Sequence, residues 1–317
     1  MDTSLQVFRI PHGRYNGASK GSRPSVFLQH AVLGDASHWI SNEPNNSLGF
    51  ILADAGYDVW LGNSRGNTYS SNHKTLKTHE QKFWEFSFHE MGYYDIPAII
   101  DFILKKTAQE QLYFIGHSEG STVGLIAFST YPKLTERIKV FFALAPVTTV
   151  TFARTPFTKL AKLSEKMFRI IFGNKGLFQY PTYLRKAATA LCTHHPQFCT
   201  NVLFFISGYN PPNLNMSRLD MYIAHNPAGT SVQNGLHWRQ TTPLIYKLED
   251  IKIPLAMWTG GQDFFADSRD IAMLSSRISN LIYQKHIPEW QHLDFVWGLD
   301  APEKMYMEII DIMKAYL

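Results

Sequence analysis

Short apolar runs alternate along the chain with longer segments in which apolar residues recur at helical spacing. The runs predict strands at 5–10, 25–29, 57–61, 112–116, 139–145, 254–259 and 281–287. The segments between them predict helices near 47–55, 91–107, 119–130, 268–277 and 302–316. Strands that alternate with helices are typical of an α/β fold, in which a mostly parallel central sheet carries helices on both faces.

The alternation stops between Pro146 and about Ile253, where aromatic segments punctuated by proline replace it. We therefore expect a discontinuous core formed by residues 1–146 and 253–317. Residues 147–252 should form an inserted, mainly helical cap.

One segment of this cap, residues 159–172, has the pattern of a basic amphipathic helix. Its apolar stripe consists of Leu160, Leu163, Met167, Ile170 and Ile171. Its neighbouring face carries Lys159, Lys162, Lys166 and Arg169. Such a helix either rests on an anionic lipid interface or packs its apolar stripe on the core with its lysines in solvent.

Composition narrows the class of protein. With 317 residues, of which 45% are hydrophobic, the chain can bury one large core. The net charge of +4 is modest and the basic residues form no long run, which argues against nucleic-acid binding. No uninterrupted apolar stretch approaches the roughly 18 residues of a membrane-spanning helix. We expect a soluble or peripheral protein, monomeric, with no metal or organic cofactor.

A candidate nucleophile follows one of the predicted strands. The sequence Gly116-His117-Ser118-Glu119-Gly120 comes directly after the apolar run Leu112–Ile115 and before a predicted helix. A serine on a sharp turn from strand to helix presents its hydroxyl above the sheet, and flanking glycines let neighbouring backbone pass closely. The position predicts that Ser118 is the nucleophile of a serine hydrolase.

Candidates for the acid and the base appear later, in the chain order that this class requires. Asp263 follows the predicted strand 254–259, and Asp267 is its rival for the role of acid. His292 lies in the loop after the last predicted strand. We assign His292 as the base that takes the proton of Ser118, and Asp263 as the acid that fixes its tautomer.

Six further stretches of the chain match a known family pattern: Val26–His30, Asn45–Trp60, Gly62–Asn67, Phe142–Pro146, His225–Asn234 and His292–Phe295. With them, nearly the whole chain resembles the acid lipase family, which includes gastric and lysosomal acid lipases and has the α/β-hydrolase fold. In that family the acid and base lie in the matching loops, which implies Asp263 and His292. Two backbone amides form the oxyanion hole, and their counterparts here are those of Val32 and Glu119. The resemblance implies neutral lipids, such as acylglycerols or sterol esters, as substrates.

The chain departs from the family pattern at several points. Ala31 stands where the family usually has glycine, and would cost about 1 kcal/mol if that position needed a positive φ. The cap is shortened, because the chain passes from His237–Gln240 almost at once to the strand that bears Asp263. We expect this shortening to leave Ser118 more exposed.

Glu119 is the third departure, since the family usually has glutamine after the nucleophile. A carboxylate in the first turn of a helix interacts favourably with the helix dipole, so Glu119 could contribute to stability alone. Alternatively, a protonated Glu119 mimics glutamine, and activity would then favour acidic conditions.

The cellular location is inferred mainly from the resemblance, which implies a secreted or lysosomal protein. Asn45 and Asn215 each begin a glycosylation sequon. The two cysteines, Cys192 and Cys199, are close enough to form a small disulfide loop, although the histidines between them also allow a zinc site as a weaker alternative. The chain begins without the basic start and apolar core of a secretory signal, so an intracellular form is the other interpretation.

The sequence thus predicts a lipase that cleaves fatty-acyl esters of neutral lipids at a lipid–water interface through an acyl-enzyme. Two alternatives stay open. The shortened cap favours a soluble short-chain esterase. The departures at Ala31 and Glu119, together with the segments that are missing relative to the family, favour a lipid-binding relative with weak or absent catalysis.

Overall fold

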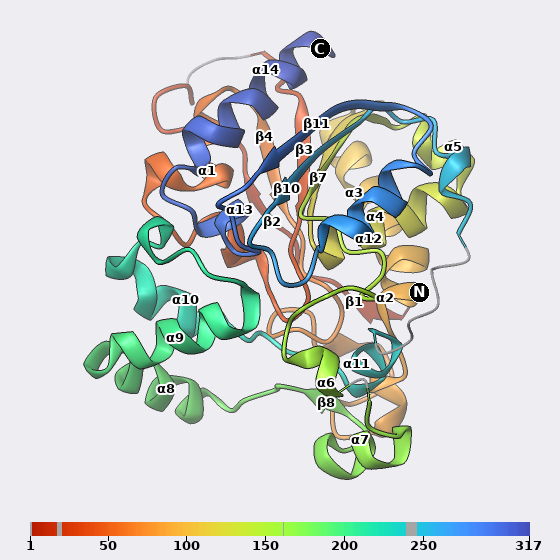
Figure 1. The fold of residues 1–317 in the computed structure, drawn as a ribbon. Coiled ribbons are helices and arrows are strands. Elements are labelled where there is room, and N and C mark those ends of the chain that lie inside the picture. The colour runs from red at the N-terminus through yellow and green to blue at the C-terminus, as the bar shows by residue number, and fades with distance from the viewer. Residues whose placement is uncertain (1, 18–20, 161, 239–245) are drawn as a thin grey trace.

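A seven-stranded sheet forms the centre of the computed structural model, which describes residues 2–17, 21–160, 162–238 and 246–317 (Figure 1). The strand order is β11-β10-β7-β6-β3-β4-β2, and all neighbours are parallel except β2, which is antiparallel to β4. The strands are β2 (Phe8–Ile10), β3 (Ser25–Gln29), β4 (Asp58–Leu61), β6 (Leu112–His117), β7 (Ile138–Leu144), β10 (Leu255–Gly260) and β11 (Leu281–Ile287). This is the mostly parallel sheet that the sequence predicts.

Helices cover both faces of the sheet because alternate strand residues bury apolar side chains on opposite faces. On β6, Phe114 packs against Phe128 of one helix layer, whereas the Tyr113 hydroxyl donates a hydrogen bond to the Met313 carbonyl of the other. Figure 1 shows α3, α4 and α12 on one side of the sheet and α1 and α14 on the other. These helices are α1 (Leu48–Asp54), α3 (Ile96–Thr107), α4 (Glu119–Thr130), α12 (Ser268–Ser275) and α14 (Met307–Ala315).

The first predicted strand, residues 5–10, is the least accurate of the set. Only Phe8–Ile10 joins the main sheet as β2, while Thr3–Ser4 forms β1 and pairs with β5 (Asn72–His73). Between them, side chains bond the backbone of Gln6: its N–H donates to Ser70 Oγ, and its carbonyl accepts from Asn63 Nδ2. These bonds replace a continuous strand ladder.

Two predicted helices contain a wider turn near proline. The helix expected at 91–107 begins as a π-helical turn, Met91–Asp95, which joins the short α2 (Phe88–Glu90) to α3. Pro97 in the first turn of α3 has no N–H to donate to the turn before it, and the wider turn accommodates that loss. The helix expected at 302–316 likewise begins with a π-helical turn, Pro302–Tyr306.

The segment between β7 and β10 lies beyond one edge of the sheet, at the bottom of Figure 1. It contains the short antiparallel pair β8 (Gly176–Leu177) and β9 (Thr230–Ser231). Its helices are α6 (Phe157–Leu160), α7 (Glu165–Phe172), α8 (Thr182–His194), α9 (Pro196–Ser207), α10 (Leu219–His225) and α11 (Val232–Trp238). It is mainly helical, as expected.

The amphipathic helix predicted at 159–172 is divided into α6 and α7, because Ser164 caps a new helix: its side chain accepts a hydrogen bond from the Met167 N–H. The predicted apolar stripe is also divided: Leu160 and Leu163 are half-buried, whereas Met167, Ile170 and Ile171 are 47%, 66% and 55% exposed. The buried side chain of α7 is that of Phe168, which lies outside the predicted stripe. Ala161, which belongs to the predicted helix, lies outside the described residues.

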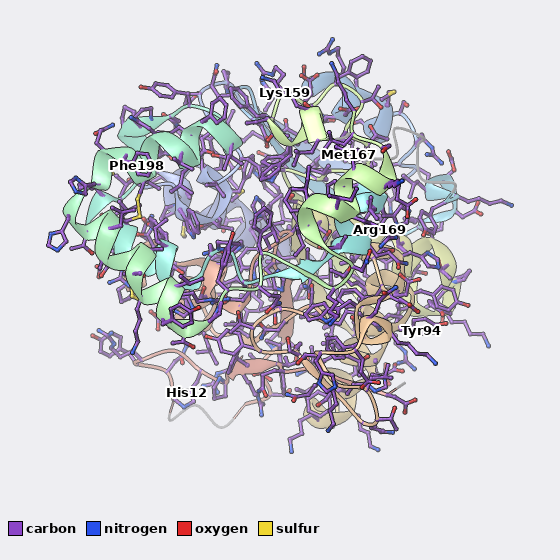
Figure 2. The ribbon with its side chains drawn as sticks, turned by 90° about the horizontal axis from the view of Figure 1, so that it is seen from below. His12, Tyr94, Lys159, Met167, Arg169 and Phe198 are labelled. Atoms are coloured by element: carbon purple, nitrogen blue, oxygen red, sulfur yellow. A yellow bond between two sulfur atoms is a disulfide. The ribbon has the colours of Figure 1, made fainter. Side chains whose placement is uncertain are left out.

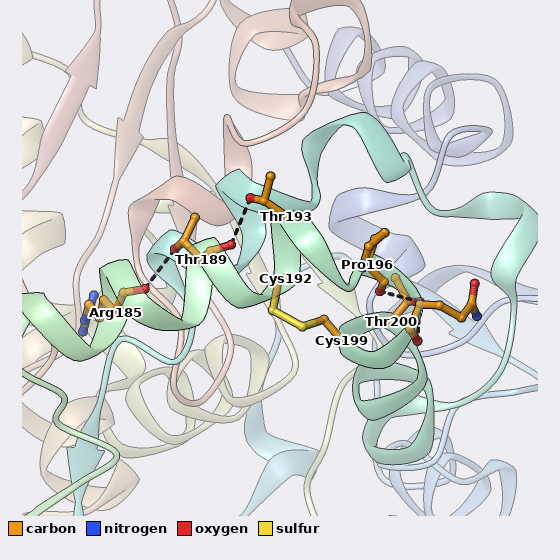
Figure 3. Close-up of a disulfide and its surroundings, with 8 residues drawn as sticks. Arg185, Thr189, Cys192, Thr193, Pro196, Cys199 and Thr200 are labelled. Atoms are coloured by element: carbon orange, nitrogen blue, oxygen red, sulfur yellow. Dashed lines mark hydrogen bonds between the residues drawn. A yellow bond between two sulfur atoms is a disulfide. The ribbon is translucent and has the colours of Figure 1, made fainter.

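Cys192 and Cys199 form a disulfide that joins the end of α8 to the start of α9 (Figure 3). Both sulfurs are therefore bonded to each other, which contradicts the zinc alternative for these cysteines. Of the helices in the described residues, none combines the length and the apolar character needed to cross a bilayer.

Candidate active site

Ser118 lies on the tight turn between β6 and α4, at the carboxyl edge of the sheet. Its backbone is strained, with φ 54° and ψ −118°. A residue other than glycine adopts this conformation only when the surrounding structure imposes it. Gly120 is required there because a Cβ would overlap the carbonyl oxygen of Gln29 on β3. The turn thereby presents the Ser118 hydroxyl above the sheet, as the motif predicts.

Two short hydrogen bonds join the three residues that the sequence proposes as nucleophile, base and acid. His292 Nε2 lies 2.8 Å from Ser118 Oγ, and His292 Nδ1 lies 2.8 Å from Asp263 Oδ2. All three side chains are at most 5% exposed. The imidazole can therefore accept the serine proton at one nitrogen while the other donates to a fixed carboxylate.

Asp263 is held by the loop that follows β10. Its Oδ1 accepts the N–H groups of Phe265 and Ala266 at 2.8 and 2.9 Å, which leaves Oδ2 for His292. The rival acid, Asp267, caps α12 and pairs with Arg269 and Arg154 instead. The geometry therefore favours Asp263 over Asp267.

The two predicted oxyanion amides lie at adjacent strand ends. Val32 follows β3 and Glu119 follows β6, and these strands pair at the point where the strand order reverses direction. Among the described residues, neither amide donates to a protein acceptor, so both are available to a ligand oxygen. Ala31 does not adopt a positive φ; the strained residue is Leu33, with φ 61°. The condition for a cost at Ala31 is therefore not met, because the turn places its left-handed residue two positions later.

A buried histidine, His30, fixes this loop, a role that no motif in the sequence predicts. Its Nδ1 lies 2.7 Å from the Ala31 carbonyl oxygen, and its Nε2 accepts the Ser64 N–H at 3.0 Å. Burial, together with the nearby His38, lowers the pKa of His30 to about 4. A neutral ring with Nδ1 protonated satisfies both bonds.

His117 supports the base in a similar way. Its Nε2 lies 2.9 Å from the backbone carbonyl oxygen of His292, and the two rings are 5.0 Å apart. Burial holds the pKa of His117 well below its usual value, so the ring stays neutral and donates this bond. Its place before Ser118 in the motif was the only signal in the sequence.

The loop of His292 is also fastened by Asp294 and by the end of α9. Asp294 accepts hydrogen bonds from Gln291 N at 2.7 Å and from Asn210 Nδ2 at 2.9 Å, and burial raises its pKa to about 7. The Ser207 carbonyl accepts the His292 N–H at 3.2 Å. Gly208 follows with φ 117°, and a Cβ there would overlap the Gln262 carbonyl oxygen. The end of α9 thus packs between the loop that carries Asp263 and the loop that carries His292.

Glu119 points away from solvent toward α11. Its Oε2 accepts hydrogen bonds from Asn234 Nδ2 at 2.8 Å and Trp238 Nε1 at 2.6 Å, and the residue is 3% exposed. Burial raises the pKa of this carboxyl, and the two hydrogen bonds offset that rise only in part. The carboxyl therefore interacts with specific side chains of α11 and not with the helix dipole alone.

The site is enclosed, since Ser118 is only 2% exposed. The greater exposure of Ser118 expected from the shortened cap is not observed. Within the described residues, His, Cys, Asp and Glu side chains form no cluster suited to a metal ion. The sequon Asn45 is exposed, whereas Asn215 is half-buried and donates to Asn42 Oδ1 at 3.2 Å.

A strained serine after a central parallel strand, bonded to a histidine and an aspartate from later strand ends, is the arrangement of serine hydrolases with the α/β-hydrolase fold. A family model described as alpha/beta hydrolase fold matches residues 24–299, and one described as a partial alpha/beta-hydrolase lipase region matches residues 4–43.

Curated relatives narrow the class further. Lipase member M of Mus musculus is 50% identical over 336 residues, which cover 98% of this chain and 80% of the relative. The lysosomal acid lipase/cholesteryl ester hydrolase of Homo sapiens is 48% identical, with 98% of this chain and 85% of the relative covered. Gastric triacylglycerol lipase of Bos taurus is 50% identical, with 98% and 84% covered.

The chain belongs to the acid lipase family of α/β-hydrolases, and it is an ester hydrolase of the lipase class. This confirms the family and fold inferred from the sequence. A solved structure of a putative lipase from Sulfolobus solfataricus has the same fold, with a TM-score of 0.68, 15% identity and coverage of 98% of this chain and 94% of that one. The alignment with the murine relative is longer than this chain, so that relative carries internal residues that this chain lacks.

Proposed function

We propose that the enzyme cleaves fatty-acyl esters of neutral lipids through an acyl-enzyme at Ser118. His292 takes the hydroxyl proton as Ser118 Oγ attacks the ester carbonyl carbon. The same proton then passes to the departing alcohol, and the acyl group stays on Ser118. Water, activated by His292, attacks this second ester and releases the fatty acid.

The oxyanion formed in both tetrahedral intermediates is assigned to the amides of Val32 and Glu119. Both are free of protein acceptors in the described residues and come from adjacent strand ends. Asp263 stays ionised and steadies the imidazolium that forms at His292.

The observation that carries this assignment is the pair of 2.8 Å bonds from His292 to Ser118 and Asp263. It is tested by steady-state and burst kinetics on a p-nitrophenyl ester. Ser118→Ala should abolish the burst, and Asp263→Asn should lower kcat by about 10⁴-fold because it fixes the wrong tautomer. Ser129→Ala, on the same helix as the nucleophile's turn but away from the site, is the control and should behave as wild type. A burst that survives Ser118→Ala would refute the assignment.

The substrate class is proposed from the relatives, whose names specify triacylglycerols and cholesteryl esters. The enclosed site favours substrates that enter from an apolar phase. Hydrolysis of triolein or cholesteryl oleate emulsions would support this proposal. Cleavage of p-nitrophenyl butyrate with no action on either emulsion would instead identify the soluble short-chain esterase.

We propose further that residues 147–252 act as a cap that meets the lipid surface, while residues 1–146 and 253–317 form the catalytic core. The distribution of charged residues between the two parts supports this division. The cap carries 12 Lys and Arg against 4 Asp and Glu, whereas the rest of the chain carries 18 against 22. A positive cap on a negative core would direct this face toward an anionic lipid surface.

Exposed apolar side chains gather on the same segment. Figure 2, seen from below, labels Met167 on α7 and Phe198 on α9 on either side of the cap. Soluble proteins rarely expose so many large apolar groups on one segment without a binding role. Those on α7, α8 and α9 that are more than two-fifths exposed are Met167, Ile170, Ile171, Tyr183, Leu184, Leu191, Phe198, Val202 and Phe205.

The surface is tested by replacing two of these residues together. Met167→Ser with Ile170→Ser should lower activity on an anionic triolein emulsion by at least fivefold and leave soluble ester hydrolysis unchanged. The double variant Phe102→Ser with Met273→Ser removes exposed apolar groups from the core and is the matched control. Equal losses on emulsion and soluble ester would refute the interfacial role.

The disulfide and the exposed sequon at Asn45 support a secreted or lysosomal location. Expression in a secreting cell line, followed by removal of N-glycans, should lower the apparent mass. Asn45→Gln should remove most of that shift, because Asn215 is half-buried and its amide is already engaged. An unshifted band would favour the intracellular form.

A further inference from the structure

The carboxyl of Glu119 connects the nucleophile turn to the cap. The backbone N–H of this residue is one of the two assigned oxyanion donors, and its side chain reaches α11 in the cap. Asn234 Nδ2 and Trp238 Nε1 both donate to the same oxygen, Oε2. Asn234 is itself fixed, since its Oδ1 accepts the Phe88 N–H at 2.7 Å.

Both donors are neutral, and the described residues supply no cation to this carboxyl. Glu119 forms none of the ion pairs in the described part of the chain. The titratable groups on the elements around it are bonded elsewhere: His237 to Ser87, Glu90 to Ser87, His89 to Tyr246, Asp95 to Arg65, and His117 to the His292 carbonyl. Within the part of the chain that the structure describes, an ionised Glu119 would therefore be a buried charge without a counter-charge.

A proton on the other oxygen, Oε1, resolves this problem without disturbing the structure. Because both N–H groups point at Oε2, the neutral acid keeps both hydrogen bonds. A glutamine would do the same with its carbonyl oxygen. The geometry thus accepts a neutral acid or an amide equally well.

We propose that Glu119 is a positioning residue that works in its protonated form, holding α11 against the oxyanion turn and keeping negative charge away from the developing oxyanion. Ionisation would place a buried negative charge one residue from the nucleophile and oppose the transition state. Turnover should therefore decline as the pH rises and Glu119 loses its proton. This inference rests on the proposed function of Ser118.

The test is the pH dependence of kcat on a soluble p-nitrophenyl ester between pH 4 and pH 8, so that lipid binding does not enter. The wild type should lose at least tenfold in kcat as the pH rises over this range. Glu119→Gln should remove most of that decline, because the amide keeps both acceptor bonds and cannot ionise. Glu119→Ala should lower kcat at every pH, because it leaves the Asn234 and Trp238 donors unpaired.

Controls separate this inference from the proposed function and from a purely structural role. Trp238→Phe keeps the carboxyl but removes one bond that favours its ionised form, so its decline should begin at a higher pH than in the wild type. A burst of p-nitrophenol in the wild type at its optimum establishes the acyl-enzyme independently; its absence would refute the proposed function. With the burst present, superimposable profiles for the wild type and Glu119→Gln would overturn the role of the proton. A folded but inactive Glu119→Gln would overturn it as well.

Discussion

Lowering the pH should destabilise this fold through His30. The ring is 3% exposed and supports the oxyanion loop by bonding the Ala31 carbonyl oxygen and the Ser64 N–H. Burial, together with the nearby His38, lowers its pKa from 6.5 to about 4. Between these two values the unfolded chain binds a proton at this residue and the folded chain does not. Stability contributed by the neutral ring is therefore complete above pH 6.5 and is lost as the pH falls toward 4.

The size of the effect follows from the shift. One pKa unit corresponds to about 1.4 kcal/mol, so the full shift from 6.5 to about 4 is worth about 3.5 kcal/mol. About 3 kcal/mol of this is reached at pH 4, where about half of the folded molecules have bound the proton. That is a large share of the 5–15 kcal/mol by which native proteins are typically stable. His30→Asn removes the titration, although it leaves the Ser64 N–H without its acceptor and should cost about 1–2 kcal/mol at pH 7.

Urea unfolding at pH 7, 6, 5 and 4 measures this dependence. Between pH 7 and pH 4, His30→Asn should lose about 3 kcal/mol less stability than the wild type. His194→Asn, which changes an exposed histidine on α8, is the control and should follow the wild-type curve. Parallel curves for the wild type and His30→Asn would refute the argument. They would mean that keeping the buried His30 ring neutral does not lower the stability of the folded protein at low pH.

Three further changes test other parts of the structure. Gly208→Ala should lower kcat more than tenfold, because the new Cβ would displace the end of α9, whose Ser207 carbonyl accepts the His292 N–H. Gly173→Ala, also at positive φ but with open space around it, is the control and should change kcat by less than twofold. Arg65→Met should cost about 3–5 kcal/mol in unfolding free energy, because it leaves Asp95 buried without its partner 2.8 Å away; Arg65→Met with Asp95→Leu should recover most of this, and no recovery would contradict the explanation. Cys192→Ser with Cys199→Ser should lower the unfolding free energy by about 2–3 kcal/mol by freeing an eight-residue loop, and an unchanged urea midpoint would count against that estimate.

Periodicity was sufficient to predict the central sheet. Strands buried on both faces read as continuous apolar runs, and those of β3, β6, β7 and β10 lie within one or two residues of the predicted bounds. The errors arise where side chains replace backbone partners. Asn63 and Ser70 interrupt the first strand by bonding Gln6, and Ser164 divides the amphipathic helix by capping α7.

The candidate site was predictable as far as motifs specify it. Ser118, Asp263 and His292 each follow a strand, and their convergence depends only on parallel strands ending at one edge. The supporting residues could not be found in this way. His30 and His117 act through contacts with distant backbone, and thirteen histidines in the chain gave no means of choosing them. The partners of Glu119 lie 115 and 119 residues away in the chain, so only the fold brings them together.

The most direct test of the central claim is to locate the residue that a fluorophosphonate labels in the folded protein. Peptide mass spectrometry should find the adduct on Ser118, and His292→Ala should slow its formation by several orders of magnitude while leaving the fold intact. An adduct on another serine, or unchanged labelling in His292→Ala, would contradict the account.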